Sequence, residues 1–251
     1  MLEVKDLSVN IGGKDIVKHV SFSVEPGQWL MLIGPNGAGK TTIVNAISQG
    51  TPYTGEVHFE GKNVKHMKSR EMARCFGVLT QNHYVGYSFT VEEVIRLGRY
   101  SHRPGYFEGG RDVSEMLVAD AIAKTGMEPF LKQSVLTLSG GELQRAFLAQ
   151  LFVQAPKLLM LDEPTNHLDL VYQKQVFQLV RKWMDDTGGA VVSVVHDLSL
   201  ARMYGTHAVL LSQGKMVTSG PIGSAFDPAV IDKVYSMDVK AWMNELFSQW
   251  Q

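Results

Sequence analysis

The sequence predicts an α/β protein with a mostly parallel sheet, an antiparallel β subdomain and a helical subdomain inserted in the middle of the chain. Two observations predict this class. Short, fully apolar runs such as Trp29–Ile33 and Leu158–Leu161 are typical of strands that are buried on both faces of a parallel sheet. Between them, from about residue 82 to residue 154, the pattern becomes mostly helical. We therefore expect a sheet built from both ends of the chain.

Composition and charge limit the possible functions. The chain has 251 residues, a formal net charge of -1 and one cysteine, Cys75, so we expect no nucleic-acid partner and no intramolecular disulfide. Charged residues interrupt the first apolar residues, so we expect no leader peptide. The longest apolar runs are far shorter than the ~20 residues that cross a bilayer. These features predict a cytoplasmic protein that reaches a membrane only through a partner.

The first fifty residues predict two strands followed by a strand, loop and helix. Apolar residues alternate with polar ones in Leu2–Val9, and a second β-like run, Ile16–Val24, ends at a Glu-Pro-Gly turn. The apolar run Trp29–Ile33 leads directly into a glycine-rich segment. A helix is expected from about Lys40 to Ser48.

Helical spacing predicts further helices at Val91–Leu97 and Val113–Thr125. Another buried strand is expected at Ala190–Val195. A helix with an apolar stripe from Val176 to Trp183 precedes this strand and should stop at Thr187-Gly188-Gly189.

A glycine-rich phosphate-binding pattern, G-x-x-x-x-G-K-[ST], follows the strand Trp29–Ile33. Its residues are Gly34, Pro35, Asn36, Gly37, Ala38, Gly39, Lys40, Thr41 and Thr42. Glycines let the backbone curl so that amides point at phosphate oxygens, and the following helix presents its positive end to the same anion. Lys40 can reach the β- and γ-phosphates and Thr41 can ligate Mg²⁺. The alternative is a plain glycine turn. A plain turn would not explain why a buried strand precedes the loop and a helix follows it, so we predict a nucleotide site.

Two carboxylates end the apolar run Leu158–Leu161. This position places Asp162 at the carboxyl edge of the sheet, where open α/β folds bind ligands. We expect Asp162 to hold Mg²⁺ and Glu163 to orient the water that attacks the γ-phosphate. The alternative is a strand that ends in two solvated acids.

The segment Leu138-Ser139-Gly140-Gly141-Glu142 precedes a helix and has two interpretations. Ser139 and Glu142 form a capping box, which alone explains a serine and a glutamate at these two positions. A capping box does not require the two glycines, which are poor helix formers. We interpret them as a bare first turn whose amides a second anion can approach. The Ser139 hydroxyl could accept a bond from its helix and still donate one to a phosphate.

With these motifs in this order, the sequence resembles the ATP-binding-cassette ATPases. The resemblance covers about Leu2 to Val239. It implies a phosphate-loop NTPase core formed by residues 1–81 and 157–251, and a helical subdomain at 82–156 that carries the signature motif, within one domain of 1–251. It also implies ATP and Mg²⁺ as ligands.

The resemblance assigns roles to residues that are weak signals alone. Gln81 is expected to ligate or sense Mg²⁺ and the attacking water, and His196 to hydrogen-bond the γ-phosphate. Asp197 is expected to cap the helix after His196. Two copies of the cassette are expected to pack head to tail, so that residues 139–141 of one copy close over the ATP of the other, with Asp169 at the seam.

One position departs from the family pattern. Members usually carry an aromatic residue near position 11 that stacks on adenine, whereas this chain has Ile11. An aliphatic side chain covers a purine face without the ring–ring contribution of ~0.5–1.5 kcal/mol. We expect weaker and less base-selective ATP binding, with Ile11 still at the site.

The single-cassette format is similar to importer subunits, and the segments 97–102 and 166–169 look like those of the group that imports iron-siderophores, haem and vitamin B12. The implied partners are an integral membrane permease and, indirectly, a periplasmic or extracellular binding protein. The implied location is the cytoplasmic face of the membrane. The aromatic stretch 83–89 indicates either local packing or a groove for a permease helix. An exporter motor, a soluble cassette acting on ribosomes or DNA, and a small-molecule kinase are the alternatives.

Overall fold

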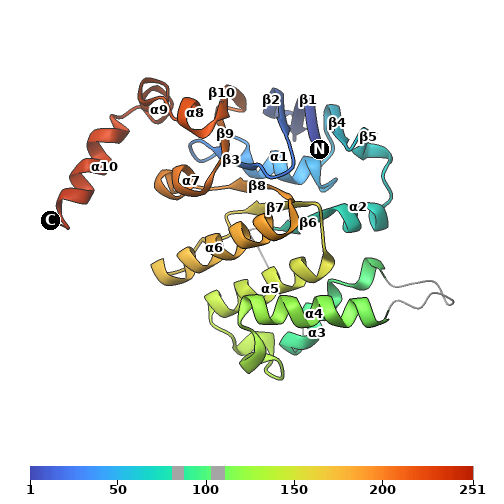
Figure 1. Ribbon diagram of the computed structural model, residues 1–251. Coiled ribbons are helices and arrows are strands. Elements are labelled where there is room, and N and C mark those ends of the chain that lie inside the picture. The colour runs from blue at the N-terminus through green and yellow to red at the C-terminus, as the bar shows by residue number, and fades with distance from the viewer. Residues whose placement is uncertain (81–87, 103–110, 251) are drawn as a thin grey trace. The chain divides into compact units, whose positions relative to one another are not determined.

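The computed structural model describes residues 1–80, 88–102 and 111–250, which form two compact units (Figure 1). The first unit comprises Met1–Lys65 and Val194–Gln251, and the second comprises His66–Ser193. The predicted domain boundaries, 1–81 with 157–251 and 82–156, stay a prediction.

An antiparallel sheet of the first unit confirms the predicted antiparallel β subdomain. Its strand order is β2–β1–β4–β5. The strands are β1 (Leu2–Ile11), β2 (Lys14–Val24), β4 (Thr54–Phe59) and β5 (Lys62–Asn63). Leu2, Val4, Leu7 and Val9 of β1 are buried, and the register with β2 shifts between Val4 and Leu7, where the alternation of apolar and polar residues is interrupted.

The first unit also holds the strand that leads to the phosphate loop. β3 (Trp29–Ile33) pairs in parallel with β9 (His207–Ser212), and β9 pairs antiparallel with β10 (Lys215–Pro221). Every residue of β3 is buried, as a strand covered on both faces requires. The helices of this unit are α1 (Lys40–Ile47), α7 (Leu198–Tyr204), α8 (Ile222–Ala225), α9 (Pro228–Tyr235) and α10 (Val239–Ser248).

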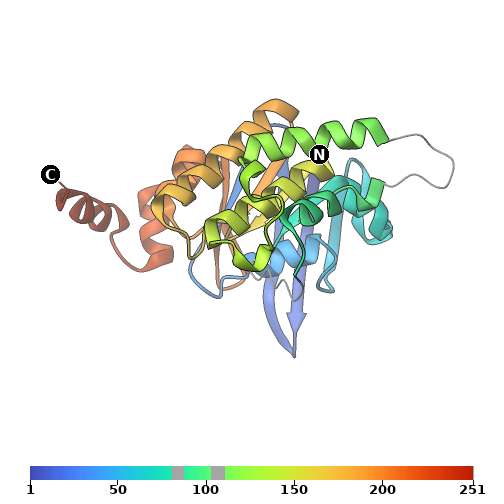
Figure 2. The same ribbon diagram turned by 90° about the horizontal axis from the view of Figure 1, so that it is seen from below.

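The second unit combines parallel strands with most of the helices. β6 (Phe76–Leu79) pairs in parallel with β7 (Leu158–Asp162), and β8 (Ala190–Val194) follows in the order β8–β7–β6. The helices are α2 (Ser69–Cys75), α3 (Val91–Leu97), α4 (Arg111–Thr125), α5 (Gly140–Gln154) and α6 (Leu170–Thr187). Short 3₁₀ turns lie at Val64–His66, Tyr100–His102, Glu128–Phe130 and Val135–Thr137. The packing of α5 between α3 and α4 confirms a mostly helical middle of the chain (Figure 2).

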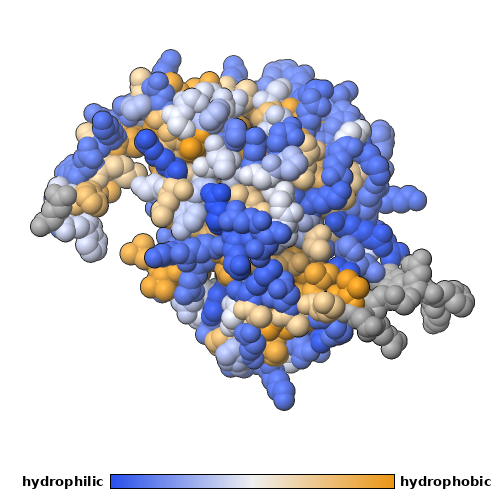
Figure 3. Space-filling model, in the orientation of Figure 1, coloured by the Kyte–Doolittle hydropathy of each residue, from blue (hydrophilic) through white to orange (hydrophobic). Residues whose placement is uncertain are grey.

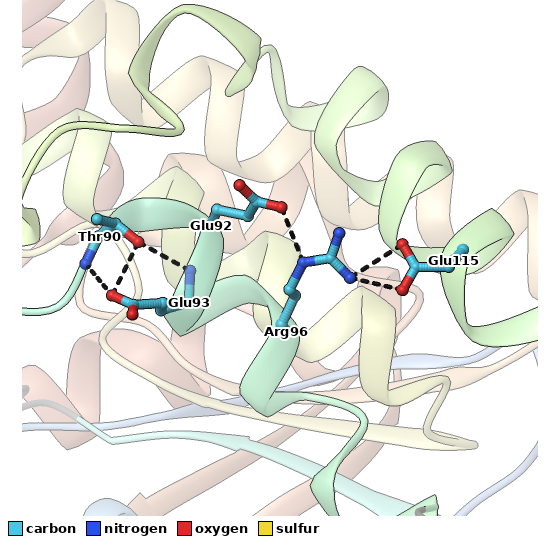
Figure 4. A network of polar contacts seen from close by, with 5 residues as sticks. All are labelled: Thr90, Glu92, Glu93, Arg96 and Glu115. Atoms are coloured by element: carbon cyan, nitrogen blue, oxygen red, sulfur yellow. Dashed lines mark hydrogen bonds and ion pairs between the residues drawn. The ribbon is translucent and has the colours of Figure 1, made fainter. Parts of the chain in front are cut away.

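Caps and ion pairs fix the helices of the second unit. Thr90 and Glu93 form a capping box at the start of α3, and Arg96 on α3 donates to Glu92 and to Glu115 on α4 (Figure 4). Exposed ion pairs of this kind contribute only about 0–1 kcal/mol each. The buried side chains of α3, such as Ile95, therefore contribute more to its stability than these charges do.

The helix α6 ends where the sequence predicts. Gly188 caps it with a φ of 67°, a left-handed conformation that glycine adopts without a Cβ penalty. Within the described ranges, none of the helices has both the length and the hydropathy that a membrane span requires.

Candidate nucleotide-binding site

The phosphate loop of the first unit folds as the glycines require. Gly34, Gly37 and Gly39 have φ values of 145°, 77° and 96°. A Cβ on Gly34 would lie 2.1 Å from the carbonyl oxygen of Leu211, and one on Gly39 would lie 2.9 Å from that of Ile16. The loop is therefore pressed against neighbouring backbone at two points, which only glycine permits.

Lys40 is buried, with 5% of its surface exposed, and its ammonium group turns back over the loop. The Nζ atom donates to the carbonyl oxygens of Gly34 at 2.7 Å and Pro35 at 3.0 Å. A buried cation must be paired with polar atoms. Phosphate oxygens can take the place of these carbonyls, so the loop fits an anion. Thr41 and Thr42 lie in the first turn of α1, whose backbone amides can face the same anion.

Tyr235, the last residue of α9, contacts the first residue of the loop. Burial raises the pKa of the Tyr235 phenol, and a hydrogen bond with the Gly34 backbone partly lowers it again. Gly34 is thus held through its amide by Tyr235 and through its carbonyl by Lys40. No local sequence pattern relates α9 to the phosphate loop, so Tyr235 could not be predicted from the sequence.

Two further predicted residues lie in the first unit. His196 is exposed and lies directly before Asp197, whose carboxylate accepts bonds from the amides of Ser199 at 2.7 Å and Leu200 at 3.0 Å. This confirms the predicted cap of α7. Ile11 ends β1, opposite Lys14, and is 51% exposed, so its side chain is accessible to a ligand.

The two predicted carboxylates lie in the second unit. Asp162 ends β7 and is buried, with 2% exposure. Glu163 adopts a left-handed φ of 52°, a conformation that costs a residue other than glycine about 1–3 kcal/mol and is enriched at active sites. The side-chain amide of Asn166 donates to the Glu163 carboxylate at 2.9 Å. Asn166 therefore orients the Glu163 carboxylate. The sequence predicted a role for Glu163 but not this contact with Asn166.

The capping box at the start of α5 is present as predicted. The Ser139 hydroxyl accepts from the Glu142 amide at 3.4 Å, and the Glu142 carboxylate accepts from the Ser139 amide at 2.7 Å. Hydrogen bonds from the Ser139 backbone and hydroxyl lower the pKa of Glu142. The hydroxyl itself donates to Glu142 at 2.8 Å. Ser139 must therefore release this bond before its proton can reach a phosphate, which the sequence analysis did not anticipate.

The two glycines of the signature motif differ in their surroundings. Gly140 is exposed, and a Cβ there would meet only Leu168, at 3.6 Å. Gly141 is buried, and a Cβ there would lie 2.3 Å from the ring of Tyr172 on α6. The interpretation of both glycines as a bare turn therefore fits Gly140, whereas Gly141 leaves room for an aromatic ring.

Hydrogen bonds bring the signature helix and the segment after β7 together. Gln144 on α5 donates to the carbonyl of Pro164 at 2.7 Å. Asp169 caps α6 by accepting from the Tyr172 amide at 2.9 Å.

The predicted site residues are divided between the two units. The second unit holds Ser139, Gly140, Gly141, Asp162, Glu163 and Asp169, whereas the first holds Ile11, residues 34–42 and His196. Gln81, residues 83–87 of the aromatic stretch and the segment 103–110 lie outside the described residues.

Comparison with known proteins decides the family. The sequence profile of the ABC transporter family matches residues 17–166. The chain belongs to the ABC transporter family. It is therefore an ATP-binding cassette, an ATPase coupled to transport, as the motifs predict.

Three curated relatives extend over nearly the whole chain. The ferric enterobactin transport ATP-binding protein FepC of Escherichia coli (strain K12) is 33% identical, covering 94% of this chain and 87% of FepC. The hemin import ATP-binding protein HmuV of Chelativorans sp. (strain BNC1) is 36% identical, covering 96% of this chain and 93% of HmuV. An uncharacterized ABC transporter ATP-binding protein of Bacillus subtilis (strain 168), YvrA, is 37% identical over 97% of this chain, which spans only 55% of YvrA.

Solved structures confirm the fold. The cbiO1 protein of Clostridium perfringens, part of the ABC transporter complex cbiONQ, superposes with a TM-score of 0.80 at 21% identity, covering 98% of each chain. A dimeric ATP-binding cassette in a post-hydrolysis state, bound to ADP and Pi, gives a TM-score of 0.76 at 24% identity, covering 88% of this chain and 99% of that one. The predicted phosphate-loop α/β fold is thus confirmed.

Replacement of Gly141 by alanine should destabilise the chain, and replacement of Gly140 should not. The added Cβ at 141 meets the Tyr172 ring, and overpacking of this kind costs about 1–3 kcal/mol. Gly140→Ala meets only ordinary contact, and alanine favours helix. Urea unfolding measures both variants. Adding Tyr172→Leu to Gly141→Ala should restore part of the loss, and equal effects of the two alanines would contradict this packing.

Removal of the Tyr235 hydroxyl should weaken ATP binding. A hydrogen bond of this type contributes about 0.5–1.5 kcal/mol, so Tyr235→Phe should raise the KM for ATP by about 2- to 10-fold. The kcat should stay nearly constant, because the hydrogen bond of Tyr235 goes to the first residue of the loop and not to a residue assigned to the attacking water. Steady-state ATPase assays separate the two constants. An unchanged KM, or a loss confined to kcat, would show that this hydroxyl does not hold the loop for the nucleotide.

Proposed function

We propose that this cassette powers a membrane importer whose substrate is an iron-siderophore, haem or a cobalamin. The named relatives support this proposal: FepC transports ferric enterobactin and HmuV imports hemin. Each of these two matches covers at least 87% of the relative, so the similarity extends well beyond the phosphate loop.

The phosphate loop supports the nucleotide part of the proposal most directly. Residues 34–42 would surround the triphosphate, with Lys40 transferring its ammonium group from the carbonyl of Gly34 to the β- and γ-phosphates. Ile11 would cover the adenine. The two contacts at Gly34 stabilise the curled shape of the loop.

Mg²⁺ is the cofactor that we propose for this site. Thr41 and Asp162 would hold it, with Gln81 as a further ligand, because hydroxyl, carboxylate and amide oxygens are the ligands that Mg²⁺ prefers. Its charge would neutralise the phosphate oxygens during hydrolysis. The position of Asp162 supports this role, because it ends β7 at the carboxyl edge of the sheet, where open α/β folds bind ligands.

Glu163 is the residue that we propose as the orienting group for the attacking water. Asn166 holds its carboxylate in place, so the acceptor is oriented before the water arrives. His196 would donate a hydrogen bond to the γ-phosphate, and Gln81 would contact the same water. Lys40 would stabilise the charge that remains on the phosphates.

The working assembly that we propose is a homodimer of cassettes packed head to tail. Ser139, Gly140 and Gly141 of one copy would close over the ATP bound by the other, and Asp169 would lie at the seam. The exposure of Ser139 and Gly140 supports this proposal, because another chain can reach them. To donate to the γ-phosphate, Ser139 would exchange its bond to Glu142 for one to the nucleotide.

The cassette would act at the cytoplasmic face of the membrane, held there by integral permease subunits. A periplasmic or extracellular binding protein would deliver the substrate to the permease without touching the cassette. The near-zero net charge agrees with protein partners rather than nucleic acid.

Purification of the tagged chain from membranes tests the importer assignment. We expect a permease and a substrate-binding protein to copurify, and we expect the complex to release phosphate from ATP without an acceptor. Lys40→Ala should abolish phosphate release while the permease still copurifies, because the lesion lies only at the nucleotide. Copurification with ribosomes, or with membrane proteins that export their substrates, would contradict the proposal.

A further inference from the structure

A groove of about 500 Å³ lies between α7, α8, α9 and α10 of the first unit, and none of its lining residues is among those assigned to the nucleotide. Its floor is apolar: Leu198, Phe226 and Ile231 line it and are at most 9% exposed. A volume of this size falls within the range of roughly 300–1,000 Å³ that is typical of small-molecule sites.

The groove is open along α10, which is weakly attached. Asp232 accepts from the Val239 amide at 2.8 Å and so holds the start of α10. Further along, the Ser199 hydroxyl approaches the Met243 sulfur at 4.0 Å. None of the ten residues of α10 is buried. An isolated helix this short is only marginally stable in water, so α10 gains from any molecule that fills the space beneath it.

α10 contributes two apolar residues, Val239 and Met243, and two polar ones, Lys240 and Asn244, to the lining of the groove. Its other apolar residues, such as Trp242 and Leu246, lie outside this lining. Trp242 and Leu246 are each 45% exposed. The segment that carries α10 has hydrophobic residues among hydrophilic ones on the face seen in Figure 3. The apolar body of an occupant would therefore contact Val239 and Met243 as well as the floor of the groove.

The rim of the groove is cationic. Arg202 on α7 and Lys240 on α10 line it, and in the described part of the chain neither side chain has an ion-pair partner. The one acid in the lining, Asp232, uses an oxygen to hold the Val239 amide. Two cations against one acid leave an excess positive charge, which favours an anionic head group.

The size and charge of the groove suit a small molecule. Its volume of about 500 Å³ is typical of a small-molecule site, and its positive rim favours an anion over a neutral apolar molecule.

We propose that this groove binds a small organic anion with an apolar body, which Arg202 and Lys240 hold by its charged head while α10 closes over its apolar part. The proposal does not depend on the importer assignment. The groove nevertheless adjoins the nucleotide half of the cassette, because α7 begins two residues after His196 and α9 ends at Tyr235.

A matched pair of fluorescent probes tests the charge requirement. Anilinonaphthalene sulfonate is an anion with an apolar body, and N-phenylnaphthylamine is its uncharged counterpart. With the full-length chain we expect one saturable sulfonate site per chain, with at least about tenfold tighter binding than the uncharged probe, the size expected for a charge-assisted contact. The double variant Arg202→Gln/Lys240→Gln should lose this preference. Lys233→Gln, an exposed lysine on α9 outside the groove, is the matched control and should keep it.

A groove-filling variant tests the location. A Cβ on Gly223, which lines the groove, meets nothing within 4 Å, so Gly223→Phe can place a ring in the space without a clash at its base. This variant should block both probes. Unchanged sulfonate binding in either the double variant or Gly223→Phe would overturn the proposal. So would a change of oligomeric state in Gly223→Phe, since the groove would then belong to an interface. If the unmodified chain bound the sulfonate probe as expected but did not hydrolyse ATP, that result would count against the proposed function alone.

Discussion

The buried ammonium group of Lys40 is the constraint on which the nucleotide half of this cassette depends. A cation with 5% exposure needs oxygen partners, and the loop provides the carbonyls of Gly34 and Pro35. These carbonyls can point at Lys40 only because the backbone curls through left-handed glycines packed against Leu211 and Ile16. Tyr235 then holds the amide of Gly34 from the other side. These contacts restrict the conformation of the loop, and a restricted loop lowers the entropic cost of binding a phosphate.

The second unit applies the same principle to different groups. Glu163 is placed by a strained backbone and by the amide of Asn166, and the first turn of α5 is placed by its capping box and by Tyr172. Gln144 connects these two elements through the carbonyl of Pro164. A movement of α5 would therefore be transmitted to the segment that follows Glu163, which suits a machine in which hydrolysis and subunit closure are coupled.

The sequence predicted the features whose cause is local. The strand Trp29–Ile33, the cap at Asp197 and the end of α6 at Gly188 each depend on neighbouring residues, and the structure confirms them. Contacts between distant residues escaped prediction. Tyr235 meets Gly34, and Tyr172 explains Gly141, only through the tertiary fold. The strands β4, β9 and β10 and the helices α8, α9 and α10 also had no prediction. No residue of α10 is buried, so burial does not explain why this segment is helical.

The central claim is that the phosphate loop of one chain and the serine-glycine turn of a second chain enclose the same triphosphate. The most direct test is a structure of the Glu163→Gln chain with ATP and Mg²⁺, because loss of the orienting carboxylate should halt hydrolysis and retain the nucleotide. The account predicts a dimer in which the Ser139 hydroxyl has left Glu142 and lies within hydrogen-bonding distance of the γ-phosphate held by Lys40 of the other copy. A nucleotide-bound structure in which residues 139–141 are remote from every ATP would contradict it.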